Sequence, residues 1–207
     1  MKQNNLAALT EDMIATCLAA KQTGAIESRF PQGLIATQLR LAAVMIPFLK
    51  IHREWQILFI RRTSKLQDPH SGQVAFPGGA NEPQDVDLQA TALREMNEEI
   101  GVNPKDVRIL GCLNDFVTIT SFQVTPFVGL APWPYPLKLE LNEVSRAFTI
   151  PLEWLADPRN HRVQQRALPS PYEPVPVVYF EPYDGEVLWG ATAGFTLALL
   201  DVLACSG

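Results

Sequence analysis

The alternation of hydrophobic and polar positions predicts a chain that mixes strands with helices. Between residues 10 and 21, the side chains of Met13, Ile14, Cys17 and Leu18 fall on one face of a helix. Several short apolar runs, rich in β-branched and aromatic residues, predict strands instead. These runs cover residues 39–49, 55–60, 107–113, 122–130, 175–181 and 186–189.

Three further helices are predicted downstream. The longest begins at a cap, either Asp85 or Asp87, and runs to Ile100, where Gly101 ends it. The other two are expected at residues 151–156 and 192–204. Strands and helices follow one another without a regular β-α-β alternation, which favours an α+β fold over a doubly wound parallel sheet.

Polar segments and chain length indicate how these elements are organised. Turns are expected at residues 50–54 and 184–185, and residues 61–79 are predicted to be mostly loop. With 207 residues, of which 47% are apolar and 19% charged, the chain can bury a sizeable core. We therefore expect one main domain at 39–207 and an N-terminal helical extension at 1–38 that packs on it.

Composition excludes several classes of function. The chain has 22 acidic and 17 basic residues and a net charge of −5, so we expect no nucleic-acid partner, although a few local cations could bind a phosphorylated small molecule. Cys17, Cys112 and Cys205 lie far apart, which argues against a disulfide scaffold or a cysteine zinc site. A polar N-terminus and a longest apolar stretch of 14 residues predict a cytoplasmic protein with no membrane partner.

Three carboxylates share one face of the longest predicted helix. Glu95, Glu98 and Glu99 fall within an arc of about 100°, and Arg94 is spaced to pair with Glu98. The apolar side chains occupy a separate face, which we expect to pack against the sheet; they are Ala92, Leu93, Met96 and Ile100.

Like charges on one helical face repel each other and raise carboxylate pKa values, unless a cation lies between them. Mg2+ and Mn2+ prefer oxygen ligands, and Glu95 and Glu99 are spaced to hold one such ion. Glu98 could be a further ligand, or could orient or deprotonate water. The alternative is a solvated acidic face, but the Pro-Gly-Gly turn before the helix and the glycine after it favour a metal site.

Residues 94–102, Arg-Glu-Met-Asn-Glu-Glu-Ile-Gly-Val, resemble the second half of the Nudix box at every fixed position. The first half departs from the family pattern, because Ala80 and Val86 stand where a glycine and a glutamate are usual. Gly79 indicates a loop one residue longer, and one of the two aspartates that could cap the helix would replace the glutamate. The resemblance implies an α/β/α sandwich in which helices flank a mixed β-sheet.

Other segments are similar to the coenzyme A pyrophosphatase subfamily of Nudix hydrolases, and the likeness extends over about residues 38–204. The segments are 58–62 with 70–79, which precede the box, then 122–129, 142–144 with 150–152, and 189–194. The segment around Asn142-Glu143-Val144 resembles one that often supplies an additional acidic residue. The stretch between Arg62 and His70 is one residue longer than usual, and Gln67 or Asp68 stands where a basic residue is common.

The resemblance implies a hydrolase that uses Mg2+ or Mn2+ to cleave coenzyme A or its derivatives into 3′,5′-ADP and 4′-phosphopantetheine. Glu95, Glu99 and Glu98 would bind the metal, and the catalytic set would be Glu98, Arg94 and Glu143. An alternative is a pyrophosphohydrolase for ADP-ribose, dinucleotides or another nucleoside diphosphate linked to X. A second alternative is a domain that senses nucleotides without turnover, against which the intact glutamates argue.

Substrate contacts are expected around the phosphates. Arg61 and Arg62 end a strand, where alternation directs only one of them inward, and the sequence leaves open which one. The remaining candidates for substrate binding are Lys65, His70, Gly78, Gly79 and Phe122. The partner is thus a small nucleoside diphosphate, with coenzyme A favoured, and a homodimer is one candidate for the oligomeric state.

Overall fold

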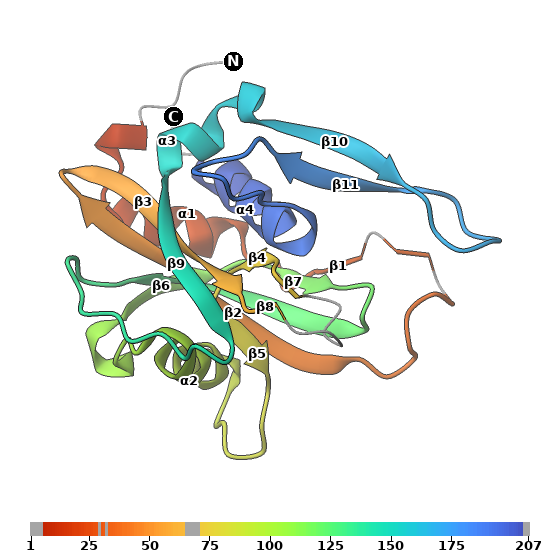
Figure 1. Ribbon diagram of the computed structural model, residues 1–207, viewed down its shortest axis with the longest axis horizontal. Coiled ribbons are helices and arrows are strands. Elements are labelled where there is room, and N and C mark those ends of the chain that lie inside the picture. The colour runs from red at the N-terminus through yellow and green to blue at the C-terminus, as the bar shows by residue number, and fades with distance from the viewer. Residues whose placement is uncertain (1–5, 29, 32, 65–70, 205–207) are drawn as a thin grey trace.

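The computed structural model describes residues 6–28, 30–31, 33–64 and 71–204. Within these ranges, nine strands form one mixed sheet between two layers of helices (Figure 1), which confirms the predicted α+β sandwich. The strands are β1 (Ile26–Ser28), β2 (Arg40–Ile51), β3 (Glu54–Arg62), β4 (Val74–Ala75), β5 (Gly78–Ala80), β6 (Arg108–Cys112), β7 (Asp115–Val117), β8 (Phe122–Leu130) and β9 (Val144–Pro151). Neighbours follow the order β1-β7-β8-β2-β3-β4, with β5 beside β2, β6 beside β8 and β9 beside β3.

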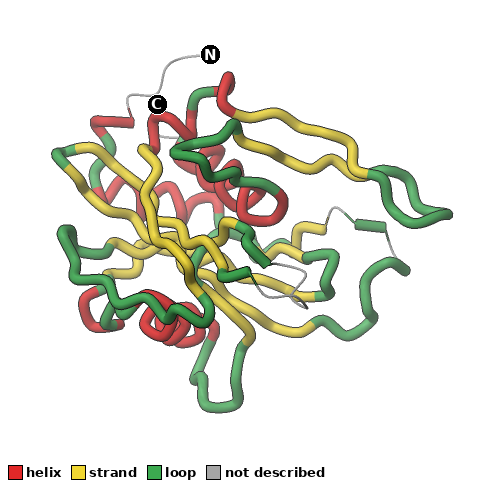
Figure 2. The backbone as a smooth tube through the Cα atoms, viewed as in Figure 1, coloured by secondary structure: helices red, strands yellow, loops and turns green. Residues whose placement is uncertain are grey.

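Helices cover both faces of this sheet (Figure 2). One face carries α2 (Leu88–Ile100), and the other carries α1 (Glu11–Lys21), α3 (Leu152–Ala156) and α4 (Gly190–Leu203). A separate two-stranded hairpin packs on α4; its strands are β10 (His161–Arg166) and β11 (Val175–Phe180). Short 3-10 helices complete the described chain at η1 (Leu6–Ala8), η2 (Pro104–Asp106) and η3 (Pro158–Asn160).

The central strand β2 supplies both halves of the core, because successive side chains of a strand point to opposite faces. Ile46 and Phe48 are buried in the cluster that includes α1 and α4. Met45 and Leu49 are buried in the cluster on the α2 side. Met96 of α2 joins the second cluster, so the predicted apolar face of this helix does pack against the sheet.

Both ends of α2 are stabilised by the residues that the sequence indicated. The carboxylate of Asp87 accepts the backbone N–H of Ala90 at 2.7 Å, so Asp87 is the N-cap. Gly101 adopts a left-handed conformation with φ of 74° and donates its N–H to the carbonyl of Asn97 at 2.9 Å. The predicted helix is therefore confirmed, and the choice between the two possible caps is settled.

Most of the predicted strands and helices are confirmed to within two residues at each end. The strand predicted at residues 186–189 is wrong, since only isolated bridges join Tyr183 to Glu186 and Tyr179 to Trp189. The prediction of a loop at 61–79 overlooked the short strands β4 and β5.

Two longer strands were not predicted, for different reasons. In β10, five of the six residues are exposed, so no alternation of buried and exposed positions marks the strand. In β9, Arg146 stands on the same face as Phe148 and Ile150 and interrupts the apolar pattern there.

The N-terminal segment shares the core of the molecule. Ile14 and Leu18 of α1 are buried in the same cluster as Phe116 and Leu199, and β1 pairs with β7 in parallel. The boundary between 1–38 and 39–207 stays a prediction. No helix in the described part of the chain is long and apolar enough to cross a membrane.

We predict that Asp87→Ala lowers the free energy of unfolding by about 1 kcal/mol, because the N–H of Ala90 loses its acceptor. Urea denaturation monitored by circular dichroism measures this loss. Asp87→Asn keeps an acceptor oxygen and serves as the control, which should unfold at nearly the wild-type midpoint. An equal loss in both variants would contradict the capping role.

Candidate active site

The site lies where α2 crosses the end of the sheet at β5. Strand β5 pairs with β2, with Gly78 opposite Val44 and Gly79 opposite Ala43. A Cβ atom on Gly78 would lie 2.5 Å from the carbonyl oxygen of Ala43, and one on Gly79 would lie 2.3 Å from Oε1 of Glu95. A side chain at Gly78 would therefore clash with the backbone of β2, whereas one at Gly79 would displace the carboxylate of Glu95.

Glu99 is the most deeply buried carboxylate of the site, with 1% of its surface exposed. Its Oε2 accepts the backbone N–H of Gly78 at 2.9 Å, and its Oε1 lies 3.7 Å from Nη1 of Arg62. Burial raises the pKa of Glu99 to about 8; the Gly78 N–H and Arg62 oppose this rise, whereas Glu95 and Glu143 add to it.

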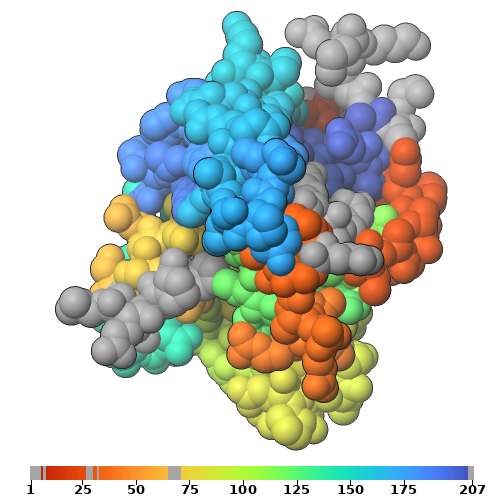
Figure 3. Space-filling model, turned by 90° about the vertical axis from the view of Figure 1, so that its right-hand side faces the viewer, coloured from red at the N-terminus to blue at the C-terminus, as the bar shows by residue number. Residues whose placement is uncertain are grey.

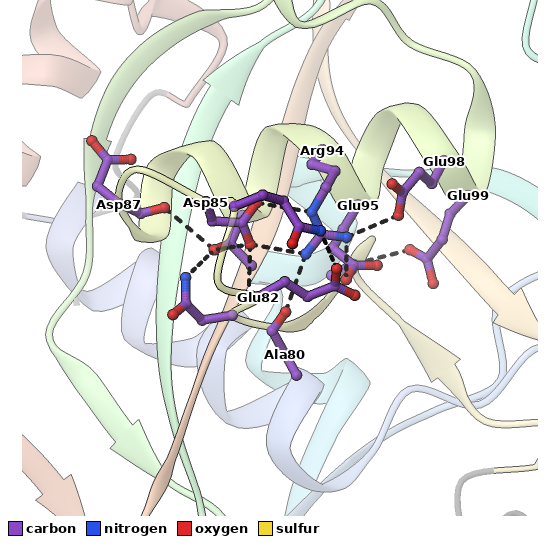
Figure 4. A network of polar contacts seen from close by, with 12 residues as sticks. Ala80, Glu82, Asp85, Asp87, Arg94, Glu95, Glu98 and Glu99 are labelled. Atoms are coloured by element: carbon purple, nitrogen blue, oxygen red, sulfur yellow. Dashed lines mark hydrogen bonds and ion pairs between the residues drawn. The ribbon is translucent and has the colours of Figure 1, made fainter.

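Arg94 joins the other carboxylates of the site (Figure 4). Its Nη1 donates to Glu95 and to Glu98, each at 2.9 Å, which confirms the predicted pairing with Glu98. Its Nε and Nη2 donate to the two oxygens of Asp85 at 2.9 and 3.0 Å, and Nη2 also reaches the carbonyl of Ala80 at 3.1 Å. One guanidinium therefore fixes the loop before α2 against two of the helix glutamates.

The sequence left open whether Asp85 or Asp87 stands in for the glutamate that the family resemblance leads us to expect. In the structure, Asp85 is the aspartate that contacts Arg94. Besides Arg94, it accepts the hydroxyl of Thr91 and the backbone N–H of Glu82, each at 2.9 Å. The hydrogen bond from Arg94 is the main reason that the pKa of Asp85 lies far below its ordinary value. Asp85 therefore pairs with the box arginine, while Asp87 caps the helix.

Thr91 is a residue of this network that we did not single out from the sequence. It is fully buried on α2, donates to Asp85 and accepts a hydrogen bond from Asn81 at 3.0 Å. The periodicity of the helix gave no signal for it, because Thr91 stands four residues before Glu95 and so falls on the same face as the glutamates.

Glu143 reaches the site on the segment that precedes β9. Backbone hydrogen bonds run from Glu140 to the carbonyl of Glu99 at 3.0 Å and from Thr63 to the carbonyl of Glu143 at 2.8 Å. The charge of the exposed Glu143 raises the pKa of Glu99 and also that of Glu95, whose pKa is raised mainly by burial. The structure therefore brings Glu143 near the helix glutamates.

The two arginines that end β3 point to different places. Arg62 faces Glu99, whereas Nη1 of Arg61 lies 3.3 Å from both carboxylate oxygens of Glu186. Arg146 also donates to Glu186, at 3.1 Å. Of the two candidate phosphate ligands, Arg62 is the one that lies beside the glutamates.

The remaining substrate-binding candidates lie elsewhere or outside the description. Phe122 begins β8, where the guanidinium of Arg40 sits 3.9 Å from its ring centroid. Among the described residues, no hydrogen bond or ring contact joins Phe122 to the glutamates. Lys65 and His70 lie outside the described residues.

The donor set suits a hard divalent cation, although it is not assembled in this conformation. Within residues 6–28, 30–31, 33–64 and 71–204, no three acidic, histidine or cysteine side chains are placed to hold a metal together. Glu95 and Glu98 flank a single nitrogen of Arg94, and the buried Glu99 carries a raised pKa. A cation among these oxygens would relieve the burial of negative charge, so their chemistry fits Mg2+ or Mn2+.

Comparison with known proteins identifies the family. The model of the NUDIX domain matches residues 39–170. The Nudix hydrolase NudL of Klebsiella pneumoniae subsp. pneumoniae is 37% identical over 160 residues, which cover 77% of this chain and 80% of the relative. NudL of Pectobacterium atrosepticum is 38% identical over 162 residues, with 75% and 79% covered. The chain therefore belongs to the Nudix family, whose hydrolases generally use divalent metal ions.

Solved structures agree with the fold. A Nudix hydrolase from M. Smegmatis, RenU, aligns with a TM-score of 0.50 at 16% identity, covering 80% of this chain and 87% of that one. The predicted resemblance to the Nudix family is thus confirmed, while the coenzyme A pyrophosphatase subfamily stays a prediction.

We predict that Asp85→Asn destabilises the protein by about 2–3 kcal/mol at pH 7, because Arg94 loses a buried charged partner. A carboxylate whose pKa is depressed by folding stabilises the native state above its unfolded pKa of about 3.9, and that contribution shrinks as the pH falls below it. Thermal melts from pH 3 to pH 8 should show the gap between wild type and variant narrowing at acid pH. A gap independent of pH would contradict this role for the charge.

Proposed function

We propose that this chain is a metal-dependent pyrophosphohydrolase that cleaves a nucleoside diphosphate linked to X, with coenzyme A or its derivatives as the first choice. The observation that carries the proposal is the grouping of Glu95, Glu98 and Glu99 beside Arg62, next to strand β5 with its two glycines. Membership of the Nudix family supports hydrolysis as the reaction, and the NudL relatives are named as Nudix hydrolases.

The metal ligands in this proposal are Glu95 and Glu99, with Glu98 as a further ligand. When bound, the divalent ion screens the charge of the diphosphate and lowers the pKa of a water molecule. Arg62 is placed to hold a phosphate oxygen, because it already lies beside the carboxylate of Glu99. Arg94 acts through the glutamates that it orients, so within this proposal it is a positioning residue.

Hydrolysis adds one water across the anhydride. The water oxygen bonds to one phosphorus, the bond from that phosphorus to the bridging oxygen breaks, and the other phosphate leaves with the bridging oxygen. The proton from water passes to a carboxylate, for which Glu98 and Glu143 are the exposed candidates of the site. With coenzyme A the products are 3′,5′-ADP and 4′-phosphopantetheine.

The preference for coenzyme A is supported by the sequence signature that precedes the helix, at residues 58–62 and 70–79. Its 3′-phosphate needs a cation besides the one at the diphosphate, and Lys65 is the nearest candidate in the sequence. Its pantetheine arm needs a long surface with apolar character, for which residues 122–136 are the proposed lining.

We predict that Glu99→Gln lowers kcat by at least about a thousandfold, because one charged ligand of the proposed metal site is lost. Independently of activity, Mg2+ or Mn2+ should raise the melting temperature of the wild type and leave that of the variant unchanged. Differential scanning fluorimetry in a metal titration, with EDTA as the blank, measures this shift. Glu153→Gln, on the exposed surface of α3, is the matched control. A normal metal shift in Glu99→Gln would remove Glu99 from the site.

We predict that coenzyme A exceeds ADP-ribose in kcat/KM by about tenfold or more, equivalent to about 1.4 kcal/mol in transition-state binding. The assay is a substrate panel with Mg2+ or Mn2+, with the products identified by mass spectrometry. Arg62→Ala should reduce turnover of both substrates, because both present a diphosphate. A tenfold preference for ADP-ribose would overturn the subfamily while leaving the hydrolase in place. Tight nucleotide binding without product, with either metal, would favour a sensor.

A further inference from the structure

The outer edge of strand β10 is open. Strand β10 pairs with β11 along one side, in antiparallel register from His161 opposite Phe180 to Arg166 opposite Val175. Along its other side, no strand among the described residues pairs with it. Figure 1 shows β10 as the outermost strand of the hairpin, and Figure 3 views the molecule from the side of the hairpin tip. A free strand edge offers unpaired N–H and C=O groups to another chain.

The hydrogen bonds near the hairpin show which backbone groups face outward. The N–H of Glu181 donates to the carbonyl of Asn160 at 2.8 Å, so Asn160 directs its backbone toward β11. Because the direction alternates along a strand, Arg162, Gln164 and Arg166 also face β11. The outward set is then His161, Val163 and Gln165, which is symmetric about Val163. Pro176, opposite Gln165, has no N–H to donate, in agreement with this alternation.

We propose that β10 pairs with β10 of a second copy of this chain, antiparallel and about a twofold axis at Val163. Val163 of each copy then exchanges both backbone hydrogen bonds with Val163 of the other, and His161 exchanges bonds with Gln165. The two hairpins become one four-stranded sheet. A twofold axis makes the contact isologous, so that each donor on one copy finds its acceptor on the other.

The side chains suit this register. Val163 is an apolar residue with 57% of its surface exposed, and across the axis it packs on its own counterpart. Arg162 comes opposite Gln164 of the other copy, so no two charges of the same sign stand directly opposite each other. Moving the axis to Arg162 or to Gln164 would keep the outward backbone groups paired, but it would set Arg162 opposite Arg162 or Arg166 of the other copy.

The charges that usually protect a strand edge are here engaged within the same chain. Arg162 forms an ion pair with Glu181, and the guanidinium of Arg166 lies 5.1 Å from the ring centroid of Trp189. The contact of five residues from each copy is short compared with the interfaces of permanent dimers, so the proposed dimer is reversible and depends on concentration.

Sedimentation velocity on the full chain, from about 5 to about 500 µM, tests the proposal. The wild type should shift from monomer to dimer across this range. Val163→Glu places two carboxylates opposite each other and should raise the dissociation constant about tenfold or more. Gln164→Glu is the matched control, because the same charge one residue along would face Arg162 of the other copy. That variant should dimerise as well as the wild type or better.

Both substitutions lie at exposed positions, and unchanged melting temperatures would show that the fold is intact. A chain that stays monomeric throughout the range would overturn the proposal and leave the edge to a strand of another protein. A dimer unaffected by Val163→Glu would place the contact elsewhere. Equal weakening by the two variants would overturn the axis at Val163.

Discussion

The guanidinium of Arg94 makes contact with three carboxylates and a backbone carbonyl at once, and the geometry of the site depends on these contacts. Asp85 accepts two hydrogen bonds from one side of the group, through Nε at 2.9 Å and Nη2 at 3.0 Å. On its other side, the same guanidinium orients the carboxylates of Glu95 and Glu98, which belong to the same helix. This arrangement compensates negative charge that would otherwise destabilise the folded chain in the absence of a cation.

Elements governed by local interactions could be predicted from the sequence. Helix α2 is such an element, because its cap, its glycine stop and the spacing of Arg94 and Glu98 are properties of neighbouring residues. The burial of Glu99 could not be predicted in this way. Periodicity placed it with two other glutamates on a polar face, whereas β5 and Arg62 enclose it from elsewhere in the chain.

The choice between Arg61 and Arg62 shows the same limit. Because side chains alternate along a strand, Arg61 and Arg62 are expected to point to opposite faces of the sheet. Which face each one takes depends on the groups that lie on the two faces. Glu186 attracts Arg61 from a turn more than a hundred residues away in the sequence, and that partner could not be inferred from the strand. Glu143, by contrast, was expected from the family resemblance, and backbone hydrogen bonds now show how its segment approaches α2.

The contact between Gly79 and Glu95 has a consequence for transferring this site to another protein. Neither Gly78 nor Gly79 adopts a left-handed backbone conformation, so backbone conformation is not the reason for glycine at these two positions. At Gly79 the carboxylate of Glu95 lies so close to the strand that even a methyl group would displace it from its present position. A designer who grafts the helix and its glutamates onto a new scaffold must therefore reproduce the spacing between helix and strand. Copying the loop sequence alone would not place the carboxylates at the correct distance from the strand.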